Sequence, residues 1–151
     1  MEKALVFMKR QKVLSFACRS GSGIWMANVY VGVDDKGLMY FVSPKSAKHS
    51  RLVEKNPVIA FSFAWFDPAD LENRKGIQGQ GICRQARGPK EMLVGLTALT
   101  KNFPTFRKTI TIKWLKDNAW GSRLWVIKPT YLKYWDDELF GDGEAQEFNL
   151  T

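Results

Sequence analysis

The sequence predicts an α+β fold that is mainly β, a small antiparallel barrel of about six strands with two or three helices. Strand-forming segments separated by turn signals fill the first half of the chain. Parallel β-α-β alternation is not sustained. Neither GxGxxG nor GxxxxGK[ST] occurs, so the two common phosphate-loop motifs are absent.

The length of 151 residues fits a single domain over residues 1–151, with an acidic tail over residues 136–151. The longest uncharged run lies between Ser20 and Val33, and a membrane-spanning helix needs ~20 apolar residues. The apolar stretch near the N-terminus is too short for a signal peptide. We therefore expect a cytoplasmic protein without a spanning helix.

The first half reads as a meander of strands followed by one helix. β-branched and aromatic residues predict strands over Val13–Arg19 and Ile24–Val33, joined by a Gly-Ser-Gly turn. A second turn over residues 34–37 leads into the strand Leu38–Val42. A short helix is expected over Ser46–Lys55, because the residue before Pro57 avoids the helical region.

The second half continues the sheet around a longer helix. Val58–Trp65 is nearly all apolar, which predicts a central strand covered on both faces. Glycines in the strand 76–88 indicate bulges or bends. A helix from Pro89 to Pro104 has a core stripe at helical spacing. The remaining expectations are a loop over Phe66–Lys75, mixed helix and loop over Phe106–Trp120, final strands within Ser122–Trp135 around Pro129, and a stripe formed by Met92, Leu96, Leu99 and Phe103.

Charge and cysteine content narrow the class of protein. The net charge is +8, yet residues 136–151 hold six acidic residues and no basic one. The rest of the chain is therefore strongly basic and suited to an anionic ligand or nucleic acid, while the tail either folds back over it or stays solvated. Cys18 and Cys83 are isolated, so we expect two reduced, buried thiols. A single histidine argues against zinc.

The segment with the clearest chemistry is the turn between the strand 38–42 and the helix that follows. Two hydroxyls, Ser43 and Ser46, lie near Lys45, Lys48 and His49. A helix N-terminus offers free N–H groups and a positive dipole end, which favour phosphate. Lysines in a first helical turn oppose that dipole, and a bound anion would account for them.

A plainer interpretation of the same turn stays open. Ser46 on its own is an ordinary N-cap residue. Lys48, Arg51 and Lys55 can form a solvated helix face. What favours a phosphate site is that two serines, two lysines and the only histidine fall within seven residues.

Aromatic residues suggest where a flat ring would lie. Six tryptophans are spread along the chain, and most are expected in the core or at an interface. In the strand 24–33, the small Ala27 and the polar Asn28 would let a heterocycle lie against the backbone. Asn28 at a solvent-facing or bulged position is the alternative.

Hydrolytic machinery is not apparent in this sequence. There is no GxSxG motif, and a serine triad would have to use His49 beside several lysines. The acidic pairs Asp34-Asp35 and Asp136-Asp137 fall in a turn and in the tail, where solvation explains them.

Taken together, these segments resemble the pyridoxamine 5′-phosphate oxidase-like flavin-binding split barrels. The order and spacing of several segments carry the resemblance, which spans residues 11–140. The segments are Asp35–Ser43, Ser46–His49, Leu52–Phe63 and Gln78–Arg84, with Lys101–Arg107 and Leu124–Trp135 resembling a small subgroup of these barrels.

The resemblance implies a six-stranded split barrel that forms a homodimer, with flavin mononucleotide (FMN) in a cleft between the subunits. The phosphate would bind at the turn, on Ser43, Ser46, Lys48 and His49. The ring would lie along Ala27 and Asn28. The partner's later strands would contribute Gln78, Gln80 and Trp125.

The activity implied is that of a flavin-dependent oxidoreductase, in which the cofactor carries out the redox step. Lys48-His49 stands where the vitamin-processing members often have an Arg-Lys pair, so pyridoxamine phosphate oxidation itself is not expected. A non-catalytic protein that binds flavin, deazaflavin or haem on the same fold is the first alternative. A basic barrel that binds single-stranded nucleic acid is the second.

Overall fold

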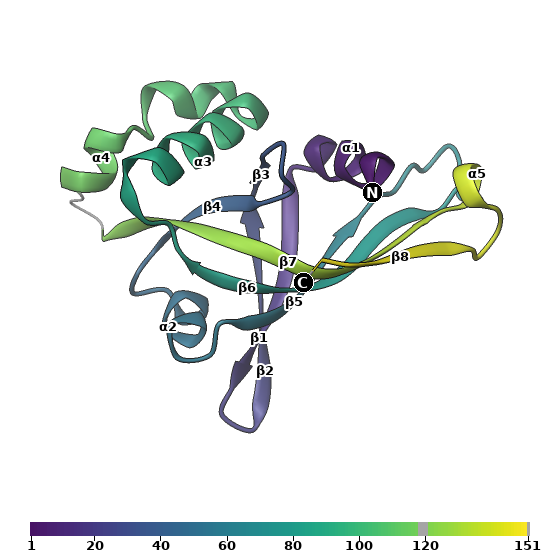
Figure 1. Ribbon diagram of the computed structural model, residues 1–151, viewed down its shortest axis with the longest axis horizontal. Helices are drawn as coiled ribbons and strands as arrows, with labels where there is room; N and C mark the ends of the chain where they lie inside the picture. Colours follow the sequence, from purple (N-terminus) through teal and green to yellow (C-terminus); the bar gives the residue numbers. More distant parts are fainter. Residues whose placement is uncertain (118–120, 151) are drawn as a thin grey trace.

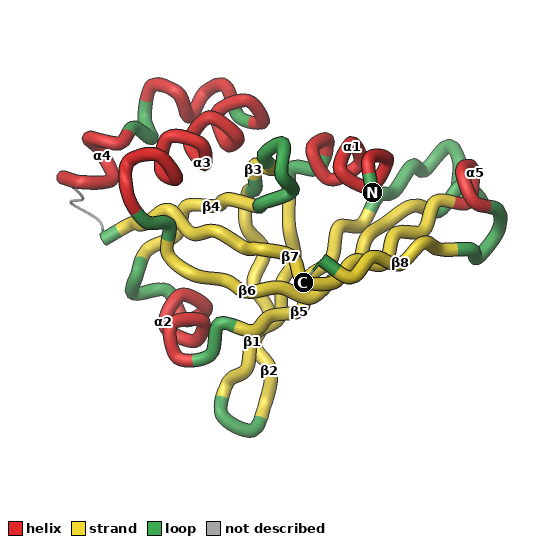
Figure 2. Tube along the Cα trace, in the orientation of Figure 1, coloured by secondary structure: helices red, strands yellow, loops and turns green. Residues whose placement is uncertain are grey.

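The computed structural model describes residues 1–117 and 121–150, in which one antiparallel sheet curls into a partial barrel with helices at its margins (Figures 1 and 2). The strand order is β2-β1-β5-β6-β7-β4-β3, and β8 adds to β7. The strands are β1 (Val13–Ser20), β2 (Gly23–Tyr30), β3 (Gly32–Val33), β4 (Met39–Pro44), β5 (Val58–Ala64), β6 (Lys75–Gln85), β7 (Ser122–Asp136) and β8 (Ala145–Asn149). The helices are α1 (Glu2–Arg10), α2 (Lys48–Lys55), α3 (Gly88–Asn102), the 3-10 helix η1 (Pro104–Lys108), α4 (Ile112–Asp117) and α5 (Asp137–Phe140).

The mainly β class is confirmed, but the expected numbers of elements are too low. The described residues form eight strands and five α-helices, against six strands and two or three helices expected. None of these helices is long and apolar enough to cross a membrane.

The strand expected over Ile24–Val33 is broken at Val31, and the break is what curls the sheet. Before it, β2 pairs with β1; after it, β3 pairs with β4 at the other end of the sheet. Gly32 lets α3 pack directly against this bend, because a Cβ there would lie 2.4 Å from the backbone of Ala98 in α3. One bent segment therefore belongs to both ends of the sheet.

The expectation that Val58–Trp65 is covered on both faces is wrong for this chain. β5 is central in the strand order, yet its exposure alternates along the strand. Ile59, Phe61 and Phe63 are buried, while Val58 is 56% exposed. The outward positions are small or apolar rather than polar, so the apolar run by itself suggested two covered faces.

β7 is a single strand that continues through Pro129, where we expected separate strands. Proline lacks the N–H that a ladder needs, so it is tolerated at irregular positions. Here the pairing with β6 shifts between Gln80 and Gly81, opposite Pro129. A Cβ at Gly81 would lie 2.7 Å from the carbonyl oxygen of Lys128, so the glycine allows this close crossing, as its bulge-forming role predicted.

The ends of the chain hold structure that the sequence did not indicate. The amphipathic α1 buries Ala4, Phe7 and Met8 against the barrel core. The acidic tail folds back: α5 begins it, β8 pairs with β7, and Asp137 makes an ion pair with Arg74 at 2.9 Å. Of the two alternatives for the tail, folding back over basic residues is the one observed.

The long helix and the cysteines agree with the expectations. α3 packs Leu96 and Leu99 into a second core cluster, with Met92 and Phe103 partly buried against it. Cys18 and Cys83 are buried free thiols, and burial raises the pKa of Cys83 to about 12. The segment 66–74 is a loop, as expected. Residues 106–117 contain the end of η1, a short loop and α4, which fits the expected mixture of helix and loop, and residues 118–120 lie outside the described residues.

Candidate cofactor-binding cleft

A cleft of about 280 Å³ opens between β2, β4, the first turn of α2 and the α3–η1 region. It brings together residues that are far apart in the sequence, including three of the expected site residues. Its lining residues are Asn28, Val29, Tyr30, Val42, Ser43, His49, Leu99, Phe106 and Ile110. One end is polar and the other apolar.

The polar end is built on a hydrogen bond between Ser43 and His49. Ser43 Oγ lies 2.7 Å from His49 Nε2. The imidazole is half-buried, edge-on to Phe16 with ring centroids 5.6 Å apart. Burial among these rings lowers the pKa of His49 below its usual value, so the ring is neutral at physiological pH.

The first turn of α2 leaves its N–H groups without a cap. The helix begins at Lys48 rather than at Ser46, and Ala47 occupies the N-cap position with no side-chain hydrogen bond to the helix. Ser46 therefore does not act as the N-cap residue; it lies exposed in the turn before the helix. No acidic residue occupies the first helical turn. This end of α2 thus retains the unsatisfied donors and positive dipole that attract an anion.

The two lysines of the turn are held differently. Lys48 Nζ lies 3.8 Å from the centre of the Trp25 ring on β2, a cation–π contact that fixes the ammonium group beside the β1–β2 hairpin. Lys45 Nζ lies 3.6 Å from a carboxylate oxygen of Glu54. Lys48 is therefore the lysine of the turn whose charge has no carboxylate partner among the described residues.

Ala27 and Asn28 point to opposite faces of β2, because side chains alternate along a strand. Ala27 is partly buried against the main core. Asn28 lines the cleft and accepts a hydrogen bond from Ser15 Oγ at 2.6 Å. Its amide nitrogen has no protein partner among the described residues, so it remains available as a donor.

Gln78 and Gln80 lie away from the cleft, on the outer face of β6. The strand register places Gln78 beside Ser62 of β5, in the same row as Asn28 of β2. Neither lines the cofactor cleft, and Gln78 instead lines a separate hollow of about 300 Å³ together with Ser15, Met26 and Ser62. Their contact with a cofactor from a second subunit stays a prediction.

Trp125 lies beneath the turn rather than on a surface. It is fully buried and stacks on Phe41 at 6.3 Å between ring centroids. Its indole N–H donates to the Ser43 carbonyl oxygen at 3.1 Å. Since none of the ring is exposed, Trp125 positions the turn and offers no contact surface for a cofactor.

Sequence reasoning missed the apolar end of the cleft. Tyr30 packs against Phe103 and Phe106, whose rings stack with centroids 5.0 Å apart. Tyr30, Phe106 and Leu99 line the cleft as a wall that joins β2 to η1. The aromatic residues around Pro104 were the one sequence signal that could have indicated this wall.

Comparison with known proteins shows which sequences and folds this chain resembles. No protein-family model matches the sequence. A UPF0306 protein of Yersinia enterocolitica is 28% identical over 88 residues, 58% of this chain and 59% of the relative. A UPF0306 protein of Campylobacter jejuni is 29% identical over 86 residues, 56% of this chain and 62% of the relative. The chain thus matches only about three fifths of the length of these curated relatives.

Solved structures extend the likeness over the whole sheet. A haem-binding protein from Mycobacterium smegmatis has a TM-score of 0.76 at 14% identity, covering 98% of this chain and 57% of that one. An FAD-binding protein from the same organism has a TM-score of 0.65 at 11% identity, covering 98% and 96%. A candidate pyridoxamine 5′-phosphate oxidase from Listeria innocua has a TM-score of 0.66 at 12% identity, covering 88% and 95%. The chain therefore has the expected pyridoxamine 5′-phosphate oxidase-like split-barrel fold, which is found in proteins that bind flavin or haem.

Proposed function

We propose that the cleft binds FMN and that the protein is a flavin-dependent oxidoreductase. The observation that carries this proposal is the uncapped N-terminus of α2 at the polar end of the cleft, with Ser46 and Lys48 beside it. A phosphate would satisfy the free N–H groups and neutralise the charge there. Bound FMN would supply hydride or electron transfer.

The residues of the cleft then divide into two roles. Ser46, Lys48 and the first-turn N–H groups hold the phosphate, and Ser43 with His49 shapes the turn behind it. Asn28 directs an amide donor toward the heterocycle, while Leu99 and Phe106 exclude water from its apolar edge. FAD- and haem-binding proteins of the same fold support a flat, anionic guest at this site.

A second copy of the chain is part of the proposal, because the cleft is small. At about 280 Å³ it lies at the lower limit of pockets that enclose a ligand, ~300 Å³. The adjoining sheet surface is apolar and exposed, which suits a partner subunit. This outer face consists of Val13, Ile24, Met26, Tyr30 and Val58, exposed by 47, 77, 64, 60 and 56%.

Sedimentation of the wild type should show a dimer. Met26→Glu should dissociate this dimer, whereas Leu93→Glu on α3 should leave it intact. A monomeric wild type would refute the dimer proposal.

The cofactor proposal is tested by titrating FMN and riboflavin, which differ only by the phosphate. For the double variant Ser46→Ala/Lys48→Ala we expect FMN affinity to fall by about tenfold or more, ~1.4 kcal/mol or above. Riboflavin affinity should change by less than about twofold, since neither residue contacts the ring. Flavin fluorescence quenching measures both.

The matched control removes the same two side-chain types elsewhere. Ser22→Ala/Lys55→Ala changes an exposed hairpin serine and the lysine at the far end of α2, so both affinities should stay at the wild-type level. An equal loss of FMN and riboflavin in the first double variant would mean that the turn does not hold the phosphate.

Haem is the second candidate, and one observation favours it. His49 is the only histidine, and it lines the cleft with a half-buried imidazole of lowered pKa. A neutral imidazole is a common axial ligand of haem iron. Added haemin would then give a Soret band that shifts in His49→Ala; an unshifted band would remove this candidate.

A further inference from the structure

A second concave site lies between α1, Trp65 and the start of α5. Figure 1 shows α1 and α5 near the same margin of the sheet, with α3 and α4 beyond α1. This α1 groove has a volume of about 760 Å³, within the ~300–1,000 Å³ typical of small-molecule pockets. Its apolar walls are Val6, Phe7, Trp65, Tyr134 and Leu139. Val6 and Leu139 are 45% and 43% exposed, so apolar surface faces solvent inside a concave site.

One face of α1 sets the charge pattern of the groove. Lys3, Val6, Phe7 and Arg10 all line it, and their spacing of three, four and seven residues places them on one side of the helix. The rise of ~1.5 Å per residue separates the two cations by about 10 Å along the axis. An apolar stretch with a cation at each end is therefore presented to the groove.

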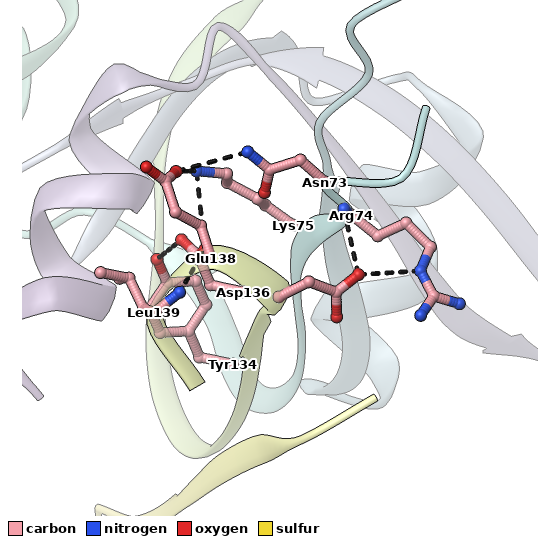
Figure 3. A network of polar contacts seen from close by, with 8 residues as sticks. Asn73, Arg74, Lys75, Tyr134, Asp136, Glu138 and Leu139 are labelled. Carbon is pink, nitrogen blue, oxygen red and sulfur yellow. Dashed lines mark hydrogen bonds and ion pairs between the residues drawn. The ribbon is translucent and has the colours of Figure 1, made fainter. Parts of the chain in front are cut away.

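The two acidic groups at the floor share one lysine. Asp136 is only 3% exposed and accepts a hydrogen bond from the Tyr134 hydroxyl at 2.7 Å. Figure 3 shows Lys75 between two carboxylates: it contacts Glu138, and its Nζ lies 3.5 Å from Asp136. The floor thus forms a network of two carboxylates around one ammonium group, in which the buried Asp136 has two partners.

The basic residues of α1, unlike Lys75, have no carboxylate partner among the described residues. Across residues 1–117 and 121–150, neither Lys3 nor Arg10 makes an ion pair with a carboxylate. Glu2 and Gln11 are the other polar residues of the lining. The lining as a whole holds three basic and three acidic residues. Since Lys75 is taken up by Asp136 and Glu138, Lys3 and Arg10 are the basic groups left to pair with a bound anion.

We propose that the α1 groove binds an amphipathic organic anion, an aromatic or apolar body that carries a carboxylate. The body would lie between Trp65, Phe7 and Leu139, where it removes apolar surface from water. The carboxylate would pair with Arg10, whose planar guanidinium suits bidentate contact. This site is separate from the cleft and does not depend on flavin binding.

A pair of probes with the same ring and opposite charge tests the proposal. Naphthylacetate and naphthylmethylamine are titrated against the full chain by calorimetry. We expect the acid to bind about tenfold tighter than the amine, and Arg10→Gln to remove most of that difference. Val6→Trp, which fills the groove, should abolish binding of both. Arg107→Gln, an exposed arginine on η1 outside the groove, should bind the acid as the wild type does.

Three results would overturn the proposal. The first is equal affinity for acid and amine, and the second is an unchanged affinity in Arg10→Gln. Competition by FMN would be the third, because it would place the probe in the cleft. Arg10 is exposed, so Arg10→Gln should keep the fold, and a wild-type circular dichroism melt verifies this.

Discussion

The cleft and the α1 groove are both concave and both carry polar groups, but they differ in what those groups already bind. In the cleft, the first turn of α2 has no side-chain cap, and the amide nitrogen of Asn28 has no partner among the described residues. Ser43 is held from below by Trp125 and is hydrogen-bonded to His49. In the groove, the buried Asp136 is satisfied by Tyr134 and Lys75. Open donors on a supported turn are suited to a specific anion, whereas the network in the groove mainly holds the structure together.

Two tryptophans give the largest test of this difference. Trp125 is fully buried under the cleft, so Trp125→Ala should lower the free energy of unfolding by about 3–5 kcal/mol. Trp65 in the groove wall is only partly buried, and Trp65→Ala should cost about 1–2 kcal/mol. Urea denaturation measures both. Similar losses would show that the cleft has no stronger support than the groove.

The network at the floor of the groove gives an intermediate effect. Lys75→Met removes one partner of the buried Asp136 carboxylate and should destabilise the fold by about 1–3 kcal/mol. Lys128→Met changes an exposed lysine on β7 and should have little effect. If the two variants unfold at the same urea concentration, the network contributes no stability.

The smallest effect is a pH dependence that comes from His49. Burial lowers its pKa in the folded state, so the unfolded chain binds the proton more readily. This residue therefore contributes stability above its unfolded pKa of ~6.5, which is lost as the pH falls through the folded pKa.

Urea midpoints between about pH 7.5 and about pH 5 should consequently fall more steeply for the wild type than for His49→Gln, which does not titrate. Parallel pH profiles for the two proteins would mean that His49 keeps its ordinary pKa.

Local signals were enough to predict much of the sheet and the position of the candidate site. The turn over residues 34–37, the helix end before Pro57 and the glycine bulge in β6 each follow from the conformational limits of one or two residues. Ser43 and His49 were expected side by side because a short turn joins their elements. Asn28 was expected near them from the order of segments, which also carried the split-barrel fold.

What the sequence did not predict depends on contacts between distant segments. α3 packs on Gly32, next to the break at Val31. The apolar wall of the cleft needs η1 to fold toward Tyr30. α1 has only nine residues, too short for a clear periodic pattern, and it is held by tertiary burial. Trp125 looked like a ring contact because exposure cannot be read from residue type.

The central claim is that FMN binds in the cleft with its phosphate at the α2 turn. The most direct measurement is a crystal structure of the protein with FMN. We expect the phosphate within hydrogen-bonding distance of Ser46 and the first-turn N–H groups of α2, and the ring between β2 and η1. A phosphate bound elsewhere, for instance at Arg10 in the α1 groove, or no bound flavin at saturating concentration, would contradict the account.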